Sequence, residues 1–83
     1  MVSFPIKINK DKAIIDFNPE FYYMFTISEV CERFQHLAKF LVLFMKDQNI
    51  IRVAIKPKVE IDLEKLALEF CNHVLHEQIM LSK

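Results

Sequence analysis

The sequence predicts an α+β fold, a two-layer ββαββα domain in which two helices cover one face of a four-stranded sheet. Three observations lead to this fold class. The chain has 83 residues, enough for one domain over 1–83 but not for a second. Three short segments alternate apolar with polar residues, a fourth is apolar throughout, and two longer segments repeat apolar residues at helical spacing. Helices and sheets with one apolar face pack those faces together.

The N-terminal segment predicts a β-hairpin. Apolar residues alternate with other types from Ser3 to Asn9, and they alternate again over 12–17. Pro5 cannot donate a hydrogen bond to a neighbouring strand, so we expect the first strand to lie at an edge or to begin late. Glycine is absent, so the turns at 9–12 and 47–49 are expected to place Asn or Asp at their positive-φ positions.

A helix is predicted to follow the hairpin. Asn18 is expected to cap it, with Pro19 in the first helical position and Glu20 near the positive end of the helix dipole. The helix is expected to end near His36. Its apolar stripe comprises Ile27, Val30, Cys31, Phe34 and Ala38.

Two strands and a second helix are predicted after it. Residues 40–45 are apolar on both faces, which favours a central strand. Residues 51–56 alternate as far as Pro57, which predicts a strand with a polar outer face. The last helix is expected over 63–81, with Asp62 as its N-cap.

One face of the predicted sheet is left without a cover. If both helices take one face, a set of apolar side chains from the strand at 40–45 points to the other. That set is either Leu41, Leu43 and Met45 or Phe40, Val42 and Phe44. A bare apolar face on so small a protein indicates a partner or self-association. The alternatives are that the N-terminal hairpin folds over it, or that it is exposed without consequence.

Seven residues are candidates for binding a partner: Phe21, Tyr22, Tyr23, Phe25, Arg52, Lys56 and Asn72. The aromatic residues at 21–25 are of the types that interfaces enrich, although core packing explains some of them equally well. The fourth strand is basic and suits strand addition by an extended acidic peptide. A few cations without stacking aromatics are weak support for nucleic-acid binding, and ordinary surface charge is the alternative.

The sequence shows no catalytic or metal-binding constellation. His73 and His76 share a helix face, but a structural zinc site needs four ligands. We expect these histidines to be solvated beside glutamates. Cys31 and Cys71 fall on apolar helix stripes, where a cysteine packs as a small apolar residue. We therefore expect no enzyme activity, no cofactor and no metal.

Composition points to a protein of the cytoplasm. The 11 basic and 11 acidic residues cancel, so the chain as a whole is not a polyanion binder. The first ten residues lack the apolar core of a signal peptide, and the longest apolar run, 40–45, is far too short to span a bilayer. Two cysteines are too few for a disulfide scaffold and are expected to stay reduced.

The segment 69–79 reads Glu-Phe-Cys-Asn-His-Val-Leu-His-Glu-Gln-Ile. It resembles the closing motif of the HxsD family, small proteins of the His-Xaa-Ser peptide-modification system, with its Phe-x-Asn-x-x-Leu core at Phe70, Asn72 and Leu75. The resemblance implies a non-catalytic accessory in ribosomal-peptide maturation. Its partner would be a radical-SAM maturase or that enzyme's precursor peptide. The residues alone also allow a self-assembling structural subunit, as a homo-oligomer, or a small nucleic-acid-binding regulator.

Overall fold

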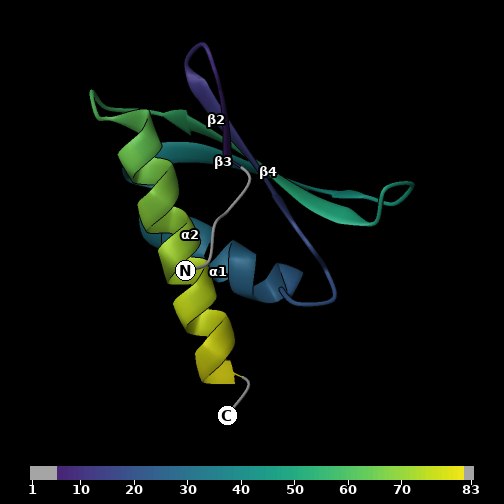
Figure 1. Ribbon diagram of the computed structural model, residues 1–83. Helices are drawn as coiled ribbons and strands as arrows, with labels where there is room; N and C mark the ends of the chain where they lie inside the picture. Colours follow the sequence, from purple (N-terminus) through teal and green to yellow (C-terminus); the bar gives the residue numbers. More distant parts are fainter. Residues whose placement is uncertain (1–5, 82–83) are drawn as a thin grey trace.

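A computed structural model describes residues 6–81 of the chain. In chain order the elements are β1 (Ile6–Asn9), β2 (Lys12–Phe17), α1 (Met24–Phe34), β3 (Ala38–Met45), β4 (Ile50–Pro57) and α2 (Leu63–Leu81) (Figure 1). The predicted α+β class and ββαββα order are confirmed. Residues 3–5 of the first predicted strand lie outside the described residues.

The four strands form one antiparallel sheet in the order β1-β2-β4-β3. β4 is central and pairs with β2 on one side and with all eight residues of β3 on the other. The prediction that 40–45 forms a central strand was therefore wrong, because β3 lies at the edge. Its apolar residues on both faces reflect one covered face and one bare face. β1 lies at the opposite edge, as Pro5 led us to expect.

Both helices lie on the same side of the sheet, which Figure 1 shows above them. The core between the two layers consists of Ala13, Ile15, Phe17, Ile27, Val30, Ala38, Ile51, Val53, Ile55, Leu66, Ala67, Phe70, Cys71 and Val74. Phe70 is central to this core. The centroid of its ring is 5.1 Å from that of Phe40 in β3 and 6.0 Å from that of Phe34 in α1. The aromatic contacts thus join both helices to the sheet.

Helix α1 begins at Met24 and not at Pro19, so the prediction for its start was wrong. Asn18 Oδ1 accepts a hydrogen bond from the Glu20 N–H at 2.9 Å, and Asn18 O accepts one from the Tyr22 N–H at 3.0 Å. These bonds close a turn. An Asn-Pro-Glu sequence suits a turn as well as a helix start, because Asn side chains bond the backbone two residues on in both.

A side chain of α2 accepts a hydrogen bond from the backbone at the start of α1. Tyr23 is the N-cap residue of α1, but its side chain makes no capping hydrogen bond. Its N–H instead donates to Oε1 of Gln78 on α2 at 3.1 Å. At the other end α1 stops at Phe34, two residues before the predicted His36, and Ala38 already belongs to β3.

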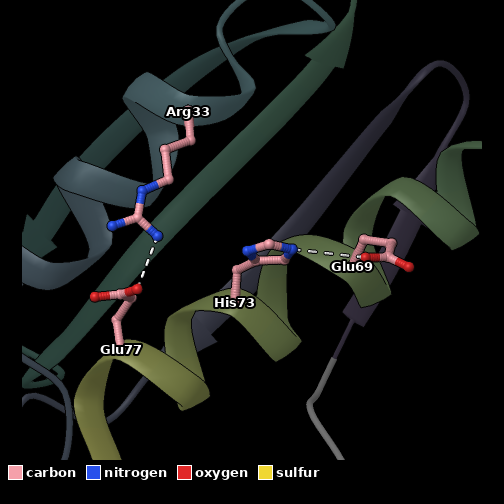
Figure 2. A network of polar contacts seen from close by, with 4 residues as sticks. All are labelled: Arg33, Glu69, His73 and Glu77. Carbon is pink, nitrogen blue, oxygen red and sulfur yellow. Dashed lines mark hydrogen bonds and ion pairs between the residues drawn. The ribbon is translucent and has the colours of Figure 1, made fainter. Parts of the chain in front are cut away.

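Helix α2 has the predicted bounds and the predicted cap. Asp62 Oδ1 accepts hydrogen bonds from two backbone N–H groups of the first turn, at 3.1 and 3.3 Å. Figure 2 shows Arg33 of α1 reaching across to Glu77 of α2, where Nη1 and Oε1 are 2.8 Å apart. His73 lies 3.8 Å from Glu69 one turn earlier, the arrangement predicted for a solvated histidine. These polar contacts lie outside the core.

The two hairpin turns use different residues at their left-handed positions. Asn49 in the β3–β4 turn has φ 51°, as predicted for a chain without glycine. In the β1–β2 turn, however, Lys10 has φ 57°, although Asn9 and Asp11 flank it. The expectation of Asn or Asp is therefore wrong at this turn. Lys10 therefore occupies a left-handed position, which typically costs about 1–2 kcal/mol for a residue other than glycine.

Candidate protein-binding surface

The face of the sheet opposite the helices has no cover among residues 6–81. We call this surface the outer sheet face; its apolar members include Ile14, Leu41, Leu43, Met45 and Ala54. Leu41 is 56% exposed and Leu43 45% exposed. Of the two sets considered for the bare face, the structure therefore places Leu41, Leu43 and Met45 there. The N-terminal hairpin does not fold over them, because β1 and β2 extend the same sheet.

Arg52, a predicted binding residue, lies on the outer sheet face but has an acidic partner within the chain. Its Nε is 2.9 Å from Asp16 Oδ1 and its Nη2 is 3.1 Å from Asp16 Oδ2. The two residues are opposite each other in the β2–β4 register. The hydrogen bond to Asp16, with the attraction of its charge, raises the pKa of Arg52. This two-point contact leaves little of the Arg52 charge for a partner.

Lys56, the second predicted cation, belongs to a group of three lysines. Lys12, Lys39 and Lys56 line a shallow hollow of about 310 Å³ on the outer sheet face, together with Leu41 and Ala54. We call it the lysine hollow. Lys39 and Lys56 are directly opposite each other in the β3–β4 register. Two like charges in such a cross-strand pair destabilise the sheet.

One acidic residue, Asp11, pairs with these lysines and compensates them only in part. Asp11 Oδ2 is 4.0 Å from Lys56 Nζ, and both side chains are mostly exposed. An exposed pair at this distance contributes little. The hollow therefore keeps a positive charge at one end of the outer sheet face, beside the apolar side chains of Leu41 and Leu43.

The basic strand cannot take an added strand, contrary to the sequence-based interpretation. Residues Arg52 and Lys56 lie on β4, whose backbone is already paired on both sides. On this side of β4, the edge of the sheet belongs to β3. A hydrogen bond from the Lys58 N–H to Leu37 O, 2.8 Å long, fixes which residues of β3 bond to β4. Since backbone direction alternates along an antiparallel ladder, residues 39, 41, 43 and 45 bond to β4.

The backbone groups of the alternate residues, Phe40, Val42 and Phe44, consequently point to the open edge. β3 is eight residues long, and its only charged side chain is Lys39. Natural proteins usually protect such edges with charges, proline or short strands. β1, the other edge, is only four residues long and includes Lys7. Among residues 6–81, the long edge without such protection is therefore β3.

The predicted aromatic residues lie elsewhere, on the helix side of the sheet. Phe21 and Tyr23 precede α1, and Phe25 is in its first turn; all three are more than half exposed. Tyr22 instead packs edge-on against Phe17 with ring centroids 5.2 Å apart. Burial, and secondarily Cys71, raises the pKa of Tyr22. Three of the four predicted aromatic side chains are thus exposed to solvent, and Tyr22 packs against the core.

Asn72 lies in a third place. It is exposed on α2 and lines an open groove of about 820 Å³ with Phe34, Leu37 and Ile61, the last from the β4–α2 connection. Leu68, 45% exposed, lines the same groove.

The structure therefore does not bring the seven predicted residues together. Arg52 and Lys56 lie on the outer sheet face, and Asn72 lines this groove. Phe21, Tyr23 and Phe25 are exposed near the start of α1, and Tyr22 packs against the core.

The structure offers no activated cysteine. Burial raises the pKa of both Cys31 and Cys71 to about 12, so both thiols stay protonated at neutral pH. The thiolate is the form that attacks substrates and binds metals. Within residues 6–81, no three His, Cys, Asp or Glu side chains come together as a metal site.

Lys12 and Lys39 are the residues that sequence reasoning missed. One begins β2 and the other follows the first residue of β3, and no local motif connects them. Only the strand register brings them to the same hollow as Lys56. The sequence could have indicated these two lysines only if the order of the strands in the sheet had been known.

No family model, curated protein or solved structure matches the chain. Nor is any helix of the described part long and apolar enough to cross a membrane. Fold and surface therefore define the class of protein. Residues 6–81 form a two-layer α+β domain with helices on one face of a four-stranded sheet. Within these residues the other face is an uncovered apolar and basic surface, and the edge strand β3 lacks protection.

Proposed function

We propose that this protein is a non-catalytic binding protein of the cytoplasm that docks onto a protein partner through the outer sheet face and the edge of β3. The observation that carries the proposal is the exposure of Leu41 and Leu43 on an uncovered face of the edge strand. Exposed apolar clusters of this kind mark interaction surfaces in small proteins. A partner would bury these side chains and pair the open backbone of β3.

The proposed setting is ribosomal-peptide maturation, in a complex with a radical-SAM maturase or its precursor peptide. Its support is the resemblance of residues 69–79 to the HxsD closing motif. Phe70 of that motif is fully buried, so we assign its aromatic ring to the fold and the partner contact to the sheet. Nucleic acid is the less suitable partner, because the described residues of the outer sheet face include no aromatic ring on which bases stack.

The experiment compares two leucines of equal exposure. Leu43 on the outer sheet face and Leu68 on α2 are each 45% exposed, so glutamine at either position changes the surface to a similar extent. Binding to a radical-SAM maturase of the His-Xaa-Ser system and to its precursor peptide would be measured by calorimetry. We expect Leu43→Gln to weaken binding at least tenfold and Leu68→Gln to leave it unchanged.

Two results would contradict the proposal. One is equal affinity for the wild type and Leu43→Gln. The other is a loss in Leu68→Gln alone, which would move the interface to the groove beside Asn72.

A further inference from the structure

The edge of β3 and the lysine hollow together specify the chemistry of what binds there. This inference rests on the proposed function and names the occupant of that surface. We infer that an extended acidic segment of the partner adds to β3 as a fifth strand. One carboxylate of the segment enters the lysine hollow, and its apolar side chains cover Leu41 and Leu43.

The first step concerns the backbone. Phe40, Val42 and Phe44 direct their N–H and C=O groups to the open edge of β3. An extended chain is the ligand that satisfies such a row, because it presents groups with the same repeat about 4.8 Å away. All eight residues of β3 pair with β4 without a break in register, so the row is continuous.

The second step concerns the side chains of the added strand. Those on the outer side would alternate and stand opposite Lys39, Leu41 and Leu43 in turn, about 5 Å away. An acidic residue opposite Lys39 and apolar residues at the next two outer positions complement this order. The charge of the hollow thus sets the register of the segment, because a slip by two residues moves the carboxylate from Lys39 to Leu41.

The third step concerns the excess charge of the hollow. Lys39 and Lys56 face each other across β3 and β4, and Lys12 lines the same hollow. Asp11, 4.0 Å from Lys56, is the acid that the described structure pairs with them. A carboxylate from a partner would relieve the repulsion between Lys39 and Lys56 while gaining from both. An acidic segment therefore fits better than a neutral one.

A second copy of the chain is the competing occupant. Strand β3 contains no acidic residue, so pairing β3 with its own copy brings no carboxylate along the strand to Lys39. Asp47, the nearest acid after β3, lies in the turn to β4 and not on the strand. Two outer sheet faces packed against each other would also bring two lysine hollows into one interface. Charge complementarity thus favours a different, acidic chain.

The test uses synthetic eight-residue peptides with blocked ends. Every second residue is threonine; of the residues between them, the first is glutamate and the others are valine. Each peptide is made in both sequence directions, because either strand polarity can pair. A glutamine peptide replaces the carboxylate, and an N-methylated peptide removes the donors that pair with β3. Amide chemical shifts of the full-length protein would be followed at peptide concentrations up to the millimolar range, at low and high salt.

We expect the glutamate peptide to shift the amides of β3 and to bind at least fivefold more tightly than the glutamine peptide at low salt. The preference should disappear in Lys39→Gln/Lys56→Gln and persist in Lys46→Gln/Lys65→Gln. The second variant loses the same charge from exposed lysines outside the hollow. The N-methylated peptide should not bind.

Three results of the peptide titrations would overturn the inference. They are an absence of β3 shifts with every peptide, equal affinity of the glutamate and glutamine peptides, or undiminished binding of the N-methylated peptide. If Leu43→Gln still weakens binding of the maturase, the proposed function stands without the acidic strand. Sedimentation tests the competing occupant. If the protein forms a dimer that neither the glutamate peptide nor the Lys39→Gln/Lys56→Gln substitutions dissociate, the inference of an acidic strand is overturned and the edge of β3 is assigned to a second copy.

Discussion

Replacing both Leu41 and Leu43 by glutamine separates binding from folding. Full burial of a leucine side chain stabilises a protein by roughly 1.5–3 kcal/mol. Since Leu41 is 56% and Leu43 45% exposed, each contributes about half of that or less. We therefore expect the double variant to lose about 2 kcal/mol of unfolding free energy. A domain of this length typically has roughly 4–12 kcal/mol, so the variant should remain folded.

The matched comparison is Ile55→Ala on the covered face of the same sheet. Ile55 is fully buried opposite Phe40, so its truncation should cost about 2–5 kcal/mol through lost burial and the cavity left behind. Urea unfolding followed by circular dichroism measures both variants. Unfolding midpoints report stability as long as the denaturant dependence stays constant. The reasoning would be refuted if the double leucine variant lost more stability than Ile55→Ala, because the outer sheet face would then be part of the core.

Three further predictions concern the helix layer. Gln78→Leu should destabilise the fold by about 1–3 kcal/mol in urea, because the Tyr23 N–H loses its acceptor. The hydrogen bond from Arg33 lowers the pKa of Glu77 in the folded protein. The ionised carboxylate therefore stabilises the fold at pH values above the unfolded pKa of about 4.3. This stabilisation is lost as the pH falls through the lower pKa of the folded state. Glu77→Gln should accordingly flatten the loss of stability measured between about pH 5 and 3. Because burial raises the pKa of Cys71 to about 12, iodoacetamide at pH 8 should modify it only as fast as the protein opens, and rapid labelling of the folded protein would contradict this burial.

Sequence patterns predicted the elements whose signals are local. The alternation in β2 and β4 and the Asp62 cap of α2 depend on neighbours along the chain, and their predicted bounds agree with the structure to within a residue. Local signals failed where two structures share one pattern. Asn18 followed by proline serves a turn as well as a helix cap. The acceptor that meets Tyr23 at the start of α1 comes from Gln78, 55 residues away.

The position of β3 in the sheet illustrates a second limit. The pattern of apolar residues along a strand does not show whether a given face of that strand is covered by the rest of the chain or is exposed. An apolar run at 40–45 therefore resembled a central strand although β3 is an edge strand. The same limit hid the lysine hollow, because Lys12 and Lys39 converge only through strand order and register. Errors of this kind fall on the surface that we propose to be functional.

Amide hydrogen exchange along β3 tests the central claim most directly, because neighbouring residues of one strand act as internal controls. The N–H groups of Leu41 and Leu43 bond to β4 and should exchange slowly with or without a partner. Those of Phe40, Val42 and Phe44 face the open edge and should exchange quickly in the free protein. On binding the proposed partner, a radical-SAM maturase or its precursor peptide, we predict that their exchange slows at least tenfold. Unchanged exchange at these three amides in a saturated complex would contradict partner binding at the edge of β3.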